Sequence, residues 1–298
     1  MSKLRFYAIY VPLKALALLP FGVLYRISDL IYLVVKHVLH YRRAVILGNL
    51  RRSFPEKSEK EIAGIADKYY RHLADLIVET VKLLHVSDKV MRKHVEVRNA
   101  EIVDDLTADG RPMVMFLGHY GNWEWAQEVS HYYKRPQVTC ELYRPVRDTA
   151  MDDIMKRIRS RYHTTLIPQK KAVRQIIGMT NEGVLYIAGF IADQRPYSMK
   201  GKHHWTTFLN QDSAYVTGGE EIGRHVNAHF AYLDIEKPRR GHYVMTFKEM
   251  NVPDDDKDEN PYSRLYLKMM EDTIRREPQY WLWSHNRWKY GRNGEKIH

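Results

Sequence analysis

The sequence predicts an α/β fold, a mostly parallel central sheet flanked by helices, with an N-terminal membrane-associated helical region. Short apolar runs recur along the chain, and segments of about ten to fifteen residues with helical character separate them. This alternation is typical of parallel sheets with crossover helices. The chain has 298 residues, of which 44% are hydrophobic, so it can bury a substantial core.

The N-terminal region alternates apolar clusters with isolated cations. Its apolar runs, residues 15–25 and 30–35, fall short of the roughly 20 uncharged residues that a spanning helix needs. We therefore expect helices that lie in a membrane interface, with tyrosines at headgroup depth and basic residues facing lipid phosphates: Lys3, Arg5, Lys14, Arg26, Lys36, Arg42 and Arg43. The alternative is a helical pair packed on the folded domain. The expected boundary separates residues 1–45 from an α/β domain at 46–298.

The remaining elements follow in chain order. Ser58 and Glu61 have the spacing of a capping box, which predicts a helix that runs through Leu84. The α/β pattern then begins at residues 95–97. Strands are predicted at 113–117, 137–141, 164–167, 184–188, 229–234 and 243–247, and helices at 122–133, 147–161, 171–181 and 213–227. The last two strands are close enough in sequence to form an antiparallel hairpin.

The charge balance favours an anionic partner. The net charge is +11 and the sequence pI is about 9.4, which suits nucleic acid, lipid headgroups or an acidic carrier protein. No helix-turn-helix, zinc or RNA-binding signature accompanies this charge, so we expect no nucleic-acid partner. The predicted helix at 147–161 has a basic segment that suits a carrier protein, lipid phosphates or plain solvation: Lys156, Arg157, Arg159 and Arg161. Cys140 is the only cysteine, which excludes an internal disulfide and a cysteine-rich metal site.

The run from Gly118 to Glu124 is the strongest chemical signal. His119 follows an apolar strand and stands five residues before Glu124, with glycines on either side that permit a tight turn. Asn122 is placed to cap the next helix. A carboxylate bonded to one ring nitrogen fixes the tautomer and leaves the other as a base, so we expect Glu124 to reach back to His119. No serine or cysteine shares the motif, which favours activation of a substrate hydroxyl. The alternative is a chance pairing of two common residues.

Polar residues follow two further predicted strands, and an aromatic and basic segment lies near the C-terminus. Arg144 comes after the strand at 137–141, and Asp193 and Gln194 come after a later apolar strand. The carboxyl ends of parallel strands are where active-site residues collect. We expect Arg144, Asp193, Gln194 and Asn122 to contact substrate, although Arg144 and Asp193 suit ordinary surface charges equally well. Core packing is the expected role of the tryptophans in the C-terminal segment 279–289.

Taken in order, these blocks resemble the late acyltransferases of lipid A biosynthesis, the lauroyl/myristoyl transferase family within the lysophospholipid acyltransferase superfamily. The resemblance covers nearly the whole chain. It includes the N-terminus, Asn49-Leu50, Phe54-Pro55-Glu56, the His119/Glu124 motif, Asp193-Gln194, Phe208-Leu209-Asn210 and the ending Trp283-Ser284-His285-Asn286-Arg287-Trp288-Lys289.

The resemblance implies an enzyme at the cytoplasmic face of the inner membrane. It would move an acyl chain from a thioester donor, acyl-carrier protein or coenzyme A, to a hydroxyl of a lipid A precursor, with no metal and no other cofactor. His119 matches the family's general base and Glu124 the carboxylate that orients it. Arg144 matches an arginine that meets phosphate or the oxyanion, and Asp193 and Gln194 fall in a third block.

The segment after Asp193 departs from the better-known family members. Gln194-Arg195-Pro196 and the loop at 197–205 are this chain's own, which leaves the acceptor open. A lysophospholipid or an amino-acid-based lipid is therefore the alternative acceptor. A basic nucleic-acid-binding protein, or a membrane scaffold without activity, is the alternative from a different class.

Overall fold

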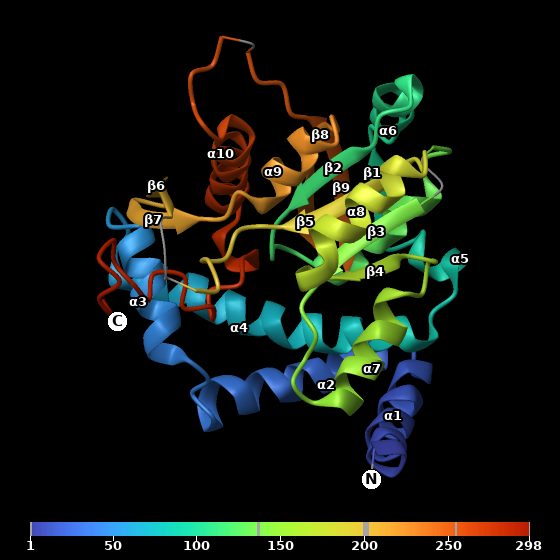
Figure 1. The fold of residues 1–298 in the computed structure, drawn as a ribbon. Coiled ribbons are helices and arrows are strands. Elements are labelled where there is room, and N and C mark those ends of the chain that lie inside the picture. The colour runs from blue at the N-terminus through green and yellow to red at the C-terminus, as the bar shows by residue number, and fades with distance from the viewer. Residues whose placement is uncertain (1, 136–137, 199–202, 254, 298) are drawn as a thin grey trace.

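A seven-stranded sheet forms the centre of the computed structural model, which describes residues 2–135, 138–198, 203–253 and 255–297 (Figure 1). The strand order is β1-β9-β8-β2-β5-β3-β4. Every pairing in this sheet is parallel except that of β8 with β9, which confirms the mostly parallel sheet and the terminal hairpin. The strands are β1 (Val95–Arg98), β2 (Met113–Leu117), β3 (Val138–Tyr143), β4 (Thr165–Pro168), β5 (Tyr186–Ile191), β8 (His229–Arg239) and β9 (His242–Glu249).

Helices cover the sheet and extend below it. In Figure 1, α4 crosses the lower end of the sheet, with α2 beneath it and α1 beside the N-terminus. The α-helices are α1 (Ser2–Leu18), α2 (Phe21–Leu33), α3 (Arg43–Ser53), α4 (Glu59–Lys82), α5 (Asp88–Met91), α6 (Glu101–Leu106), α7 (Thr149–Arg159), α8 (Ala172–Asn181), α9 (Gly218–His225) and α10 (Pro261–Arg276). The shorter helical segments are η1 (Val34–Val38), η2 (Leu83–His85), η3 (Thr107–Asp109), η4 (Trp123–His131), η5 (Gln169–Lys171) and η6 (Pro278–Tyr280).

The central strand β2 reads as a continuous apolar run because it is buried on both faces. All five of its residues are buried, between β8 on one side and β5 on the other. Parallel strands covered by helices on both faces have this character. The strand was predicted with the bounds that the structure has.

The long helix α4 begins as its sequence predicts. The Ser58 hydroxyl accepts a hydrogen bond from the Glu61 N–H, and the Glu61 carboxylate accepts one from the Ser58 N–H at 2.9 Å. This capping box satisfies two N–H groups that the helix itself leaves open. The helix ends at Lys82, and the single turn η2 continues it through His85.

The prediction of one helix at 213–227 is wrong over its first residues. They belong to a hairpin of β6 (His204–Phe208) with β7 (Gln211–Tyr215), and α9 begins only at Gly218. Leu209 and Asn210 connect the two strands, and both have positive φ angles, 50° and 61°. Two-residue hairpin turns need this backbone conformation. Residue 137, at the start of one predicted strand, lies outside the described residues.

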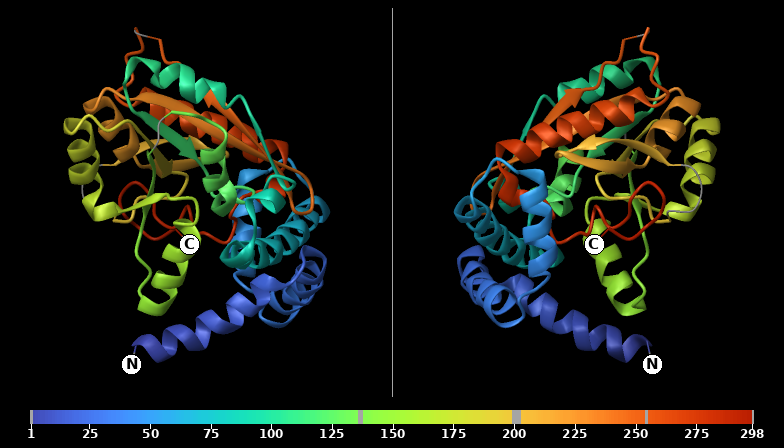
Figure 2. Two further views of the ribbon diagram at one scale, coloured as in Figure 1. Left: turned by 90° about the vertical axis from the view of Figure 1, so that its right-hand side faces the viewer. Right: turned by 90° about the vertical axis from the view of Figure 1, so that its left-hand side faces the viewer.

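The N-terminal helices pack one face on the domain and expose the other. Ala17, Leu24 and Ser28 are buried, and α2 lies along α4. Figure 2 shows these blue helices beneath α4, on the side away from the sheet. Large apolar side chains remain exposed on α1, α2 and the following turn: Leu4, Tyr7, Val11, Leu18, Val23, Leu30, Leu33, Val34, Val38 and Leu39. In the described ranges, the helices are too short or too polar for any of them to traverse a bilayer.

Several cations of this region have partners within the protein. Lys36 pairs with Asp67, Arg5 pairs with Asp148, and the Lys14 ammonium donates to the carbonyl of Leu84. The contacts of Arg5 and Lys14 form because α1 packs on α7 and α4. The Arg5 side chain remains 67% exposed, and contact of these cations with lipid phosphates stays a prediction.

The basic segment of α7 is also engaged within the protein. Arg159 pairs with Glu124, and Arg157 lies over the rings of Phe6 and Tyr10 on α1. Arg161, which follows α7, donates from its guanidinium to the carbonyls of Leu83 in η2 and of Val86. Arg157 is nonetheless exposed and forms no ion pair among the described residues, so an interaction of this segment with a carrier protein stays a prediction.

Candidate active site

Two polar motifs meet because their strands are neighbours. Strand β2 pairs in parallel with β5, with Leu117 opposite Ile191. His119 and Asp193 each follow two residues beyond this last pair, at the same edge of the sheet. Parallel strands place their carboxyl ends together, so the register alone brings the two side chains within reach.

The imidazole of His119 is bonded to Asp193. The distance from His119 Nδ1 to Asp193 Oδ1 is 2.8 Å, and the backbone N–H of His119 donates to Asp193 Oδ2 at 3.2 Å. The indole N–H of Trp281 donates to the same Oδ2 at 2.7 Å. Burial alone would raise the pKa of the Asp193 carboxyl, but the charge of His119 and these hydrogen bonds outweigh it and hold the pKa below its usual value.

This pairing prepares His119 to accept a proton. An ionised carboxylate can only accept hydrogen bonds, so Nδ1 carries the hydrogen and Nε2 keeps its lone pair. The His119 side chain is 21% exposed, whereas that of Asp193 is 1% exposed. The Gln194 amide nitrogen lies 3.4 Å from each ring nitrogen, and the Trp123 ring meets the imidazole edge-on at 5.2 Å. The arrangement therefore combines a buried orienting carboxylate with an accessible base.

The expected contact between Glu124 and His119 is a prediction that the structure corrects. Glu124 forms two hydrogen bonds with the Arg159 guanidinium, at 2.9 and 2.6 Å. Both side chains are largely buried, so turning Glu124 toward His119 would leave a buried guanidinium without this partner. Asp193 takes the orienting position instead. Spacing in sequence could not reveal this, because the decisive contacts come from α7 and β5.

A second carboxylate shares Arg159. Glu141 on β3 lies 3.3 Å from the Arg159 Nε, on the same guanidinium that holds Glu124. Burial raises the pKa of Glu141 and the neighbouring charge of Glu124 adds to this rise, while Arg159 opposes it. The Arg159 guanidinium of α7 thus links Glu124, at the start of η4, to Glu141 on β3.

Asn122 caps η4, as the sequence predicts. Its Oδ1 accepts from the N–H of Trp125 at 3.2 Å, and its amide nitrogen donates to Glu79 at 2.8 Å. The residue is 0% exposed, so the predicted substrate contact finds no side-chain surface here. Its role in the structure is to begin the helix directly after the histidine turn.

Arg144 lies at the same edge of the sheet, where its described contact is with Tyr197. It follows β3, is exposed, and its guanidinium stacks 3.9 Å above the centre of the Tyr197 ring. The loop after Tyr197 lies partly outside the described residues. Gln194, in contrast, does approach the imidazole.

The comparisons with known proteins assign the chain to a family. The family model for bacterial lipid A biosynthesis acyltransferases matches residues 2–290. The chain belongs to this family. It is an acyltransferase.

Curated relatives agree with the family assignment. The lipid A biosynthesis palmitoleoyltransferase of Escherichia coli K12 is 25% identical over 279 residues, 93% of this chain and 88% of the relative. The lipid A biosynthesis lauroyltransferase of the same strain is 22% identical over 274 residues, 91% of this chain and 87% of the relative. A crystal structure of the 1-acyl-sn-glycerophosphate acyltransferase PlsC from Thermotoga maritima aligns with a TM-score of 0.38 at 10% identity, covering 85% of this chain and 96% of that one.

The C-terminal segment of the acyltransferase packs against the turn that carries His119. The N–H of Leu282 donates to the His119 carbonyl at 3.1 Å, and Tyr120 bridges to Trp281. Trp281 and Trp283 are buried, which confirms core packing, but the Trp281 bond to Asp193 went unpredicted. The one sequence signal for this bond is the position of the aromatic segment after the last α-helix.

Two further residues of this segment lie near Asp193: Arg287 is buried and His285 is half-buried. Burial lowers the pKa of His285 to about 4 and that of Arg287 to about 10, in both cases against the attraction of Asp193. Within the part of the chain that the structure describes, no group of three His, Cys, Asp or Glu side chains has the arrangement of a metal site.

A pair of glycine substitutions tests the geometry of the turn. Gly121 has φ +57°, and a Cβ there would lie 2.7 Å from Ile235 Cγ2. Gly64, in the middle of α4, has no atom within 4 Å of such a Cβ. We expect Gly121→Ala to lower the free energy of unfolding by more than about 1 kcal/mol and to reduce activity. Gly64→Ala should raise stability by about 0.5–1 kcal/mol. Denaturant unfolding of both variants measures the contrast, and equal effects would refute the strained turn.

Proposed function

We propose that this acyltransferase moves a fatty acyl chain from a thioester donor to a hydroxyl of a lipid A precursor, with His119 as general base. The observation that carries the mechanism is the 2.8 Å contact of His119 with buried Asp193. Family membership supports the reaction class, and the names of the relatives support lipid A as the acceptor.

The proposed reaction proceeds in two steps. His119 Nε2 takes the proton of the acceptor hydroxyl while its oxygen attacks the thioester carbonyl carbon, which forms a tetrahedral oxyanion. The carbonyl then re-forms, the carbon–sulfur bond breaks, and the imidazolium returns the proton to the thiolate. Asp193 stabilises the imidazolium between these steps. A positioned base of this kind contributes about 10²–10⁴-fold in rate.

Backbone groups at the start of η4 suit the oxyanion. The first N–H groups of a helix have no partner within it, and η4 begins four residues after His119. Donors placed at a developing oxyanion contribute about 2.7–4 kcal/mol each. In this proposal Glu124 acts indirectly, because its pair with Arg159 fixes the first turn of η4.

The proposal includes work at a membrane surface, the cytoplasmic face of the inner membrane. So many large apolar side chains as α1, α2 and η1 expose are unusual on a surface that faces water, and they suit contact with lipid acyl chains. The net charge of +11 favours anionic headgroups. The donor is proposed by class alone, an acyl thioester of a carrier protein or of coenzyme A.

We expect His119→Ala to lower the rate of acyl transfer by at least about 100-fold, since the base is lost. Purified protein would be given an acyl thioester with either a lipid A precursor or a lysophospholipid, and the products weighed by mass spectrometry. The control is His225→Ala, an exposed histidine on α9, which should keep full activity. An undiminished rate in His119→Ala would overturn the mechanism. Acylation of the lysophospholipid alone would overturn the acceptor.

Removing apolar side chains from the outer face of α2 should weaken membrane binding. Leu30 and Leu33 are 64% and 49% exposed, so serine at both positions costs the fold little but removes surface that lipid would bury. The matched control is Val173→Ser on α8, at 55% exposure. Co-sedimentation with anionic vesicles measures the difference. Equal binding by both variants would place the membrane contact elsewhere.

A further inference from the structure

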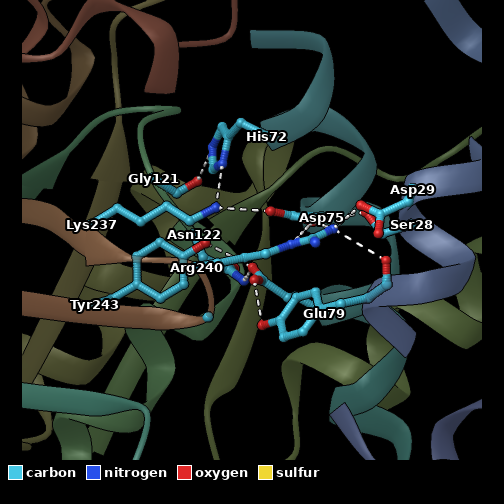
Figure 3. A network of polar contacts seen from close by, with 12 residues as sticks. Ser28, Asp29, His72, Asp75, Glu79, Gly121, Asn122, Lys237, Arg240 and Tyr243 are labelled. Carbon is cyan, nitrogen blue, oxygen red and sulfur yellow. Dashed lines mark hydrogen bonds and ion pairs between the residues drawn. The ribbon is translucent and has the colours of Figure 1, made fainter. Parts of the chain in front are cut away.

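A chain of buried polar side chains reaches the turn after His119 from beneath. The Lys237 ammonium on β8 lies 3.2 Å from an Asp75 carboxylate oxygen and 3.2 Å from His72 Nδ1, both on α4. His72 Nε2 in turn lies 3.1 Å from the carbonyl oxygen of Gly121. Figure 3 shows Lys237 pointing between Asp75 and His72, with the ring of His72 directed at Gly121. None of these contacts involves a group used in the proposed chemistry.

The hydrogen bonds from Lys237 through His72 to Gly121 can run in one direction only. An ammonium group has donors and no acceptor, so His72 Nδ1 must accept and Nε2 must carry the hydrogen given to Gly121. Burial, and then the charge of Lys237, lower the pKa of His72 well below its usual value, so the ring stays neutral. The order is therefore Asp75 carboxylate, Lys237 ammonium, neutral His72 and the Gly121 carbonyl.

Holding this carbonyl fixes the next N–H as well. A peptide unit is planar and trans, so the N–H of Asn122 points opposite to the Gly121 carbonyl and away from His72. On its other side, the Gly121 N–H donates to the carbonyl of Tyr280 at 3.0 Å. Gly121 has a positive φ angle that few other residues adopt. The hydrogen bonds to its carbonyl and from its N–H are therefore both needed to keep the turn in one orientation.

A second branch of the network holds the residue that follows. Glu79 accepts from the Asn122 amide at 2.8 Å and from the Tyr243 hydroxyl at 2.7 Å. The Tyr25 hydroxyl of α2 reaches the same carboxylate at 3.0 Å. The carboxylates of α4 thus secure the turn through two adjacent residues, Gly121 and Asn122.

The outer end of the chain is fastened to α2 and to the hairpin. Asp75 also accepts from Ser28 at 2.7 Å and from Arg240 at 2.9 and 2.7 Å, and Arg240 reaches Asp29 at 2.8 Å. Lys237 is only 4% exposed. Buried ion pairs contribute little net stability, because desolvation of the charges offsets their attraction. A cluster of this size is better explained by the geometry that it imposes.

We propose that His72, held by Lys237 and Asp75, is a positioning residue for acyl transfer: it fixes the Gly121–Asn122 peptide, and with it the turn that carries His119 and begins η4. This inference rests on the proposed function. His72 touches no reacting atom, and it acts through the backbone that begins η4.

The test replaces His72 in two ways. His72→Leu removes both polar atoms, whereas His72→Gln keeps an N–H donor and an acceptor on a side chain of similar reach. The control is Thr107→Val, which deletes a buried hydroxyl that donates to the Val103 carbonyl at 2.7 Å, away from the site. Hydrogen exchange of the segment 118–125 is followed by mass spectrometry, together with kcat, KM and the melting temperature.

We expect His72→Leu to speed exchange in the segment 118–125 at least tenfold and to lower kcat at least tenfold, with KM for donor and acceptor changed less than twofold. His72→Gln should restore most of both, and Thr107→Val should change neither. Unchanged exchange in His72→Leu, or a loss of kcat that Thr107→Val shares at equal loss of stability, would overturn the proposal. If His72→Leu does not fold, Lys237→Met breaks the chain one link earlier and is judged by the same exchange. A wild-type protein without acyl transfer activity would refute the proposed function. The exchange result would still decide whether His72 fixes the turn at 118–125.

Discussion

The parallel register of β2 with β5 is the constraint on which the site depends. It sets Leu117 opposite Ile191, so the segments that follow the two strands leave the sheet side by side. His119 and Asp193 each lie two residues further along these segments, where their side chains are close enough to bond. A slip of this pairing by one residue would turn the alternate side chains to the other face and separate the two. The buried apolar residues of both strands hold the register, so the contact of His119 with Asp193 is a consequence of core packing.

Several buried carboxylates of this protein are paired with basic side chains. Glu124 and Glu141 share Arg159, Asp75 holds Lys237, and Asp234 joins Lys248 and Arg276. An unpaired charge in such positions would cost several kcal/mol in desolvation. The pairs Asp75–Lys237 and Asp234–Arg276 join elements that are distant in sequence and help to fix how these elements pack. Asp193 differs from these carboxylates because its charged partner is a histidine.

Much of the fold could be predicted from the sequence, because local signals specify it. The apolar run of β2, the capping box of α4 and the N-cap Asn122 each act through residues within a few positions of one another. The hairpin at Leu209 and Asn210 was missed because Leu is an uncommon residue for a positive φ angle. The pairing of Glu124 with Arg159 could not be predicted, since it depends on how α7 lies against η4.

The pairing of His119 with Asp193 shows the same limit. His119, Glu124 and Asp193 were all singled out, but sequence spacing favoured the nearer acid. The topology favours the distant one, because parallel neighbours share an edge while Glu124 turns into the first helical turn toward Arg159. The sequence thus predicts candidate residues, and the strand order brings His119 to Asp193.

A double-mutant cycle tests the pairing of His119 with Asp193 most directly. Asp193→Asn and Glu124→Gln would each be measured by kcat/KM in the wild-type and His119→Ala backgrounds. If Asp193 acts through the imidazole, Asp193→Asn lowers kcat/KM strongly in the wild type and adds almost nothing once His119 is gone, whereas the effect of Glu124→Gln persists in both. The reverse result, in which only the effect of Glu124→Gln vanishes without His119, would show that Glu124 is the orienting carboxylate and contradict this account.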